Sequence, residues 1–153
     1  MHNMFINQQT EGGILNIKMD KRIYRYIEYE LYNYQQYKRE IKEIREEILE
    51  SGSFSGDGMP RGNKTGNPTE DKTVKLMTTP ALLQMEKIIK AVENVLPNLS
   101  KRHREIFDMV YIKGRTDRYM LCDELHISYE TFNLNRREIV FKVGCELGVI
   151  KTV

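Results

Sequence analysis

The sequence predicts an all-α protein with a long N-terminal helix, a flexible linker and a C-terminal helical domain that contains a helix-turn-helix. Apolar residues recur at helical spacing from about Asp20 to about Glu50. Gly, Ser, Asn and Pro then dominate a stretch without any apolar period, which is typical of a flexible linker. After the linker, apolar residues again recur at helical spacing, and residues that can cap helices accompany them. We therefore divide the chain into an N-terminal arm and helix (1–51), a linker (52–69) and a helical domain (70–153) with the helix-turn-helix at about 100–147.

The N-terminal helix combines an apolar stripe with many tyrosines, and Asp20 can cap its start. Six tyrosines lie between Tyr24 and Tyr37, more than one stripe can bury. Because Tyr is enriched at protein interfaces, we expect self-association or docking on another helix, with base stacking on nucleic acid as an alternative. A structural alternative has Tyr24 and Tyr34 packed and the other four at the rim. The stripe consists of Tyr24, Ile27, Leu31, Tyr34, Ile41 and Ile48.

A further helix is expected between the linker and the helix-turn-helix. Pro80 can occupy its first turn, and Pro97 can end it. Its apolar positions are Leu82, Leu83, Met85, Ile88, Ile89, Val92, Val95 and Leu96. Such a broad apolar face must be covered, so we expect it to share one core with the block from Ser100 onward.

That block is expected to form three short helices. Ser100 can cap the first and Gly114 can end it, while Asp117 and Ser128 can cap the second and third. The inward positions are Ile106, Phe107, Val110, Tyr111, Leu121, Cys122, Leu125, Phe132, Ile139, Val140, Val143 and Leu147. A short helix, a tight turn and a capped helix form the pattern of a helix-turn-helix. The alternative is an ordinary three-helix bundle without a role in DNA binding.

Three details around the turn favour the helix-turn-helix. Cys122 provides a small apolar side chain where two crossing helices come closest. His126 occupies the turn position where φ is often positive, which His tolerates better than most residues. Ile127 and Phe132 can form a hydrophobic staple across the capping residue Ser128.

The third helix of this block is expected to enter the major groove of DNA. Asn can read adenine, Arg can read guanine and Glu can accept from cytosine, whereas Arg136 and Arg137 could instead hold phosphates. The candidates on this helix are Tyr129, Glu130, Thr131, Asn133, Leu134, Arg136 and Arg137. The candidate phosphate contacts before and at the start of the second helix are Lys113, Arg115, Thr116 and Arg118. The alternative is that these are ordinary solvated charges.

Composition limits the kind of partner. The 153 residues carry a net charge of only +2, so nucleic-acid affinity would need a local basic face rather than a field of the whole protein. Cys122 and Cys145 lack a nearby ligand-spaced partner, which favours buried thiols in a reducing compartment. The sequence contains neither an apolar run of membrane-spanning length nor a secretory signal. We therefore expect a cytoplasmic location and no membrane partner.

No residue pattern indicates an enzyme. The three histidines are far apart in sequence, and HExxH, nucleophile-elbow and CxxC motifs are absent. The string GDGMPRGNKTG in the linker superficially suggests a phosphate-binding loop. It lacks the Gly-Lys-Thr tripeptide and a preceding strand. We therefore expect no catalytic residue, no metal site and no cofactor.

Two segments carry a family resemblance: YRYIEYELYNYQQYKREIKEIREEI (24–48) and LHISYETFNLNRREIV (125–140). The helix-turn-helix resembles the promoter-reading region four of bacterial sigma factors. The chain as a whole resembles the ArpU/RinA family of phage transcriptional activators, which implies a helical fold and activation of late phage genes through upstream DNA. The chain departs from the family at Asn133, Leu134 and Asn135, where family members tend to have aromatic and basic residues. The base preference of the family therefore does not carry over.

The expected function is sequence-specific DNA binding that activates phage or prophage late genes in the bacterial host cytoplasm. The expected partners are double-stranded DNA and, as the sigma-like resemblance implies, host RNA polymerase. One alternative is a phage DNA-packaging protein, since small terminase subunits also combine a helix-turn-helix with oligomerising helices. Ring formation would favour that class. The other alternative is a helical protein-interaction adaptor, which would not bind DNA even at low salt.

Overall fold

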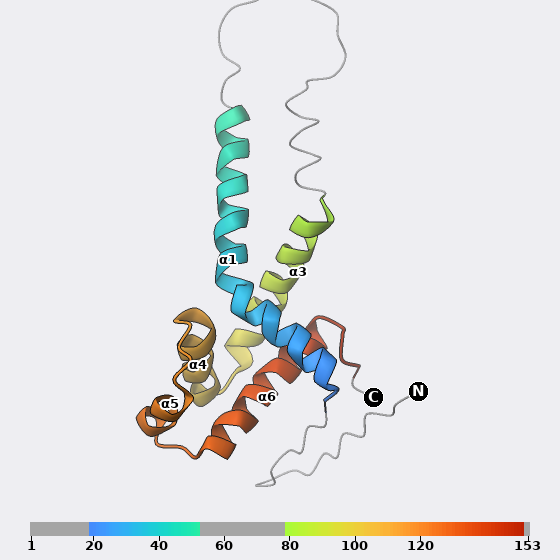
Figure 1. Cartoon of the computed structure of the whole chain (residues 1–153). Helices are drawn as coiled ribbons and strands as arrows, with labels where there is room; N and C mark the ends of the chain where they lie inside the picture. Colours follow the sequence, from blue (N-terminus) through green and yellow to red (C-terminus); the bar gives the residue numbers. More distant parts are fainter. Residues whose placement is uncertain (1–18, 53–78, 152–153) are drawn as a thin grey trace, which may run out of the picture.

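The computed structural model describes residues 19–52 and 79–151, which form helices and connecting turns without a β-strand (Figure 1). The expected all-α class is thereby confirmed. The elements are α1 (Lys21–Gly52), α3 (Pro80–Val95), the 3₁₀ turn η1 (Leu96–Asn98), α4 (Lys101–Phe107), the π-helical turn η2 (Asp108–Ile112), α5 (Arg118–Leu125) and α6 (Tyr129–Glu146). The predicted N-terminal arm, the linker beyond Gly52 and the first part of the predicted C-terminal domain lie outside the described residues.

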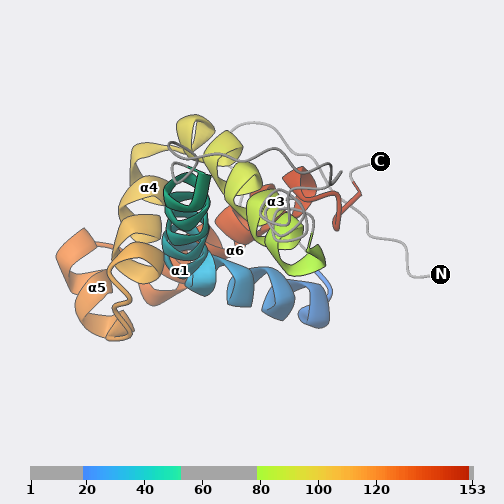
Figure 2. The same cartoon turned by 90° about the horizontal axis from the view of Figure 1, so that it is seen from above.

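Helix α1 begins at the predicted cap and is bent near its middle. One carboxylate oxygen of Asp20 accepts the backbone N–H groups of Arg22 (2.7 Å) and Ile23 (3.4 Å), which satisfies the free donors of the first turn. The first half of α1 crosses α6, and the second half turns away to run beside α3 (Figures 1 and 2). The Asn33 side-chain amide donates to the Tyr29 carbonyl (2.8 Å). Side-chain bonds of this kind accompany helix bends.

One hydrophobic core joins α1 to the C-terminal helices. Ile27, Leu31 and Tyr34 of α1 are buried in the same cluster as Phe107 of α4 and Ile139 of α6. The rings of Tyr34 and Phe107 meet edge to face with their centroids 6.0 Å apart, a favourable aromatic geometry. The long N-terminal helix therefore packs directly on the predicted C-terminal domain.

The burial of the α1 stripe corrects its expected role. Ile27, Leu31, Tyr34 and Ile41 are buried, and Tyr24 and Ile48 are half-buried. The four buried side chains fill the interior of their own chain and are not available for self-association or docking on another helix. They hold α1 against the rest of the fold. This agrees with the structural alternative, in which Tyr24 and Tyr34 pack inside the protein. Three of the other tyrosines are exposed: Tyr26, Tyr29 and Tyr32.

Helix α3 lies beside the second half of α1. Pro80 occupies its first turn, as predicted. Most of its predicted apolar face is covered, but Leu83 is about half exposed (52%). The buried residues of α3 are Leu82, Ile88, Ala91, Val92 and Val95. The exposed ion pairs that cross between the two helices contribute little, so burial of this apolar face holds them together.

The first half of α1 approaches α6 closely at Gly144. A Cβ atom added there would lie 2.5 Å from the Cδ1 atoms of both Ile27 and Ile150. The missing side chain thus makes room for Ile27 of α1 against the α6 backbone. This contact fastens the first half of α1 to the last turns of α6.

The turn between α5 and α6 has the predicted backbone. His126 follows α5 with φ of 52°, in the left-handed region. Ser128 Oγ accepts the backbone N–H of Thr131 (3.1 Å) and caps α6. Asp117 differs from its prediction, because its side chain makes no capping bond to α5. Its carboxylate accepts two hydrogen bonds from Arg115 instead.

Candidate nucleic-acid interface

A groove of about 750 Å³ runs between the first turns of α1 and the first half of α6, beside the start of α5. Five of the predicted DNA-binding residues contribute to it: Arg118, Tyr129, Asn133, Arg136 and Arg137. The remaining lining residues are Met19, Lys21, Tyr24, Arg25 and Glu28. The groove therefore joins the face predicted to read DNA to a helix that the sequence had assigned to protein contacts.

The groove is rich in positive charge that no acid of the described residues neutralises through an ion pair. Lys21, Arg25, Arg118 and Arg137 are exposed. Within residues 19–52 and 79–151, none of the four forms an ion pair with a carboxylate. Glu28 is the acid in the lining, and it pairs with a buried arginine. Four exposed cations around one groove, without an ion pair to any acid of the described residues, favour a polyanionic ligand.

Arg136 is the buried arginine, which corrects its predicted role as a DNA contact. Only 4% of its side chain is exposed. Its Nη2 atom donates to Glu28 Oε1 and lies 3.4 Å from the Tyr32 hydroxyl. Arg136 is one of the buried residues of α6, and its partner Glu28 belongs to α1. It links the two helices and is not free to reach DNA.

Two tyrosine hydroxyls complete the surroundings of Glu28. Tyr24 (3.0 Å) and Tyr111 (3.3 Å) both donate to Glu28 Oε1. Burial raises the pKa of Tyr24 to about 12 and the pKa of Tyr111 well above its ordinary value, so both stay neutral donors near pH 7. Arg136 Nε is buried without a hydrogen-bond partner in the described part of the chain. We call Glu28, Arg136, Tyr24 and Tyr111 the buried polar cluster.

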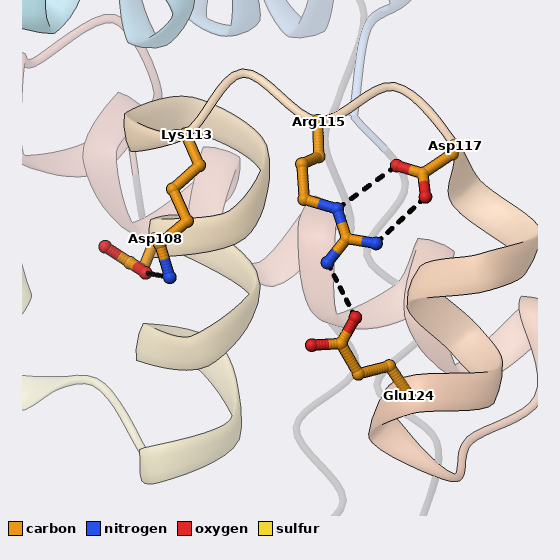
Figure 3. Close-up of polar contacts among 5 residues, drawn as sticks. All are labelled: Asp108, Lys113, Arg115, Asp117 and Glu124. Carbon is orange, nitrogen blue, oxygen red and sulfur yellow. Dashed lines mark hydrogen bonds and ion pairs between the residues drawn. The ribbon is translucent and has the colours of Figure 1, made fainter.

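Two of the predicted phosphate contacts are engaged with carboxylates instead (Figure 3). Lys113 Nζ lies 2.7 Å from Asp108 Oδ2. Arg115 binds both oxygens of Asp117 and one of Glu124, the latter at 2.6 Å. The hydrogen bonds from Arg115 lower the pKa of Asp117. Because acids of the same chain neutralise Lys113 and Arg115, these two residues add no free positive charge and hold the loop before α5 in place.

The other predicted contacts lie outside the groove lining. Glu130 and Thr116 are exposed, while Thr131 and Leu134 are half-buried. The Thr131 hydroxyl accepts a hydrogen bond from Ser128 (2.9 Å) and thus takes part in the cap of α6. Glu130 is acidic and lies in the first turn of α6, where the helix dipole favours a negative charge.

A stacked tyrosine pair flanks the groove. The rings of Tyr119 in α5 and Tyr129 in α6 lie 5.2 Å apart with an interplanar angle of 18°. Hydrogen bonds with Arg118 and Asn133 lower the pKa of Tyr129. Arg118, Tyr129 and Asn133 all line the groove. Tyr119 is 74% exposed and was not predicted, because its contact with Tyr129 depends on how the two helices cross.

Sequence reasoning also missed the contribution of α1 to this groove. Lys21 and Arg25 are one helical turn apart and line the same wall. The string KRIYR (21–25) could have indicated this contribution, because it places three cations at the start of a helix that has no acidic residue in its first turn. The helix dipole disfavours cations at this end, so their presence there indicates a role other than helix stability.

A second polar cluster joins α4 to α6. His103 Nδ1 lies 2.7 Å from Ser100 Oγ, and His103 Nε2 lies 2.6 Å from Glu138 Oε2. Although Ser, His and Glu are also the residue types of some hydrolase triads, Ser100 Oγ accepts the backbone N–H of His103 (3.2 Å) as the predicted helix cap. We therefore assign this cluster to fold stability.

Residues 19–52 and 79–151 contain no group of three His, Cys, Asp or Glu side chains that could hold a metal ion. Cys122 and Cys145 are free thiols, and burial raises the pKa of each. None of the helices in the described part of the chain is long and apolar enough to cross a membrane.

Comparison with known proteins returned no relative. Family models, curated proteins and solved structures all lack a significant match to this chain. The function proposed for this protein therefore rests on its residues, their geometry and the resemblance of two segments to the ArpU/RinA family.

Proposed function

We propose that this protein is a sequence-specific DNA-binding activator of phage or prophage late genes. In this proposal α5, the turn at His126 and α6 act as a helix-turn-helix, and α6 enters the major groove. The observation that carries the proposal is the groove beside the first half of α6. Four exposed cations surround it and no carboxylate of the described residues pairs with them.

The base-reading face would be formed by three residues at four-residue spacing. Tyr129, Asn133 and Arg137 line the same side of α6. Asn can form two hydrogen bonds with adenine, and Arg can form two with guanine.

The start of α5 would supply phosphate contacts. In a helix-turn-helix the first helix crosses the DNA backbone while the second reads bases. Arg118 is the first residue of α5 and is exposed in the groove. Its position suits a phosphate contact that sets the register of α6.

Activation of late genes rests on the resemblance to the ArpU/RinA family and to sigma region four. Contact with host RNA polymerase rests on the same resemblance. A run-off transcription assay with host polymerase, with and without the protein, tests both. DNA binding without activation, together with ring assembly in solution, would favour the DNA-packaging alternative.

Asn133 and Arg137 are expected to give the protein its sequence preference. Duplexes selected from a random library by the full chain should bind at least about a thousandfold more tightly than scrambled duplexes near physiological salt. Replacing Asn133 or Arg137 with Ala should each weaken binding to the selected duplex by about 5- to 150-fold, because each removes a bidentate base contact. Binding to the scrambled duplex should change far less. Fluorescence anisotropy measures both affinities.

Asn98→Ala and Arg102→Ala form a matched control. Both residues are exposed and lie outside the groove lining, so neither change should alter the preference for the selected duplex. Equal and weak binding of the wild-type protein to both duplexes would contradict the proposed function. Equal losses in the test and control variants would contradict the assigned reading face.

A further inference from the structure

The groove beside α6 has two walls, and the second comes from α1. Lys21, Tyr24, Arg25 and Glu28 line it from α1, at the three- and four-residue steps that place side chains on one face of a helix. The opposite wall holds Arg118 and the base-reading residues of α6. Cations therefore border the hollow on both sides.

The charge of the α1 wall is available to a ligand. Glu28 is occupied by Arg136 and by two tyrosine hydroxyls, so it does not neutralise Lys21 or Arg25. Both cations are exposed, and within the described ranges neither forms an ion pair. They lie in the first two turns of α1, where positive charge opposes the helix dipole. Binding of an anion would relieve that unfavourable interaction.

The two walls are also held at a fixed separation. The ion pair between Glu28 and Arg136 is buried between α1 and α6, and Ile27 packs in the space left by Gly144. The start of α1 is therefore positioned relative to α6 before any ligand binds. Groups that are already in place lose less entropy on binding than groups that must be ordered.

We propose that the start of α1 is a second DNA-contacting element, in which Lys21 and Arg25 hold backbone phosphates of the duplex that α6 reads. This inference rests on the proposed function. An extended polyanion suits the groove because its exposed cations are spread along two walls, and a duplex carries one charge per about 1.7 Å of its axis. Contacts of this kind add affinity and register without sequence preference.

The test is the salt dependence of DNA binding by the full chain with Lys21→Ala and Arg25→Ala combined. The slope of log affinity against log salt should become less steep by about 2, since each lost phosphate contact removes about 0.9. Affinity should fall about 10- to 100-fold near about 0.1 M salt. It should fall equally for selected and scrambled duplexes, so the ratio between them should stay constant.

The charge-matched control combines Arg39→Ala and Lys87→Ala, two exposed cations outside the groove lining. It should leave the slope unchanged. Circular dichroism should give the same helix content for both variants, because all four residues are exposed.

The inference and the proposed function fail in different ways. If the wild type prefers the selected duplex but the Lys21/Arg25 variant keeps its slope and affinity, the inference is overturned and the proposed function stands. A variant that lowers the slope on both duplexes, when the wild type has no preference, supports the phosphate contacts and contradicts sequence-specific reading. Absence of binding to either duplex at low salt overturns both.

Discussion

Replacing Glu28 with Ala is expected to lower the free energy of unfolding by about 3–5 kcal/mol. The change leaves the guanidinium of Arg136 buried without its counter-charge. It also removes the acceptor of the Tyr24 and Tyr111 hydroxyls, and an unpaired buried donor costs free energy of its own. Urea denaturation followed by circular dichroism measures the effect.

The double variant Glu28→Gln, Arg136→Met separates the missing counter-charge from lost packing. Gln keeps an oxygen that can accept from both tyrosines, and Met fills much of the volume of Arg without a charge. Because an apolar replacement of a buried ion pair is often tolerated, most of the lost stability should return. Lys42→Ala, at the exposed pair with Glu46, should change stability by less than about 0.5 kcal/mol. A loss at Glu28→Ala as small as this control would contradict the role of the buried polar cluster.

Replacing Phe132 with Ala should cost about 3–5 kcal/mol of unfolding free energy. Phe132 is fully buried and belongs to the core cluster that includes Leu121 and Cys122 of α5. The guanidinium of Arg136 also lies over its ring, 5.8 Å from the centroid. Removing the ring leaves a cavity between α5 and α6. The resulting loss of stability lowers the midpoint of urea denaturation.

Phe141→Ala is the matched control for this change. It removes the same side chain from the same helix, but Phe141 is only half-buried at the edge of the core. Its loss of stability should be clearly smaller. Equal losses of stability for the two variants would contradict the central position of Phe132 in the core.

The local features of the fold were predictable because they depend on residues close in sequence. Apolar spacing predicted the extent of α1, although not its bend, and the cap at Asp20 formed as expected. Ser100 and Ser128 cap their helices, and His126 takes the left-handed turn position. In each case a side chain acts on backbone within three or four residues of itself, which a single sequence displays directly.

The errors arose where tertiary packing decides the role of a residue. Arg136 was placed beside the outward face of its helix, but its partner Glu28 is 108 positions away. The apolar stripe of α1 was correctly identified, while the surface that covers it belongs to the same chain. Arg115 is within nine residues of both its acids, yet only the fold of the loop brings them together. The contribution of α1 to the groove likewise depends on how α1 crosses α6, which the sequence does not display.

We expect DNA to bind along the groove between α1 and the first half of α6. The most direct test is a titration of the isotopically labelled full chain with a selected duplex, followed by backbone amide NMR shifts. We expect the largest shifts in residues 21–28, 116–120 and 128–137, with little change in α3 and the second half of α1. Shifts concentrated on α3 and the second half of α1 would contradict the claim, because the duplex would then bind a different face.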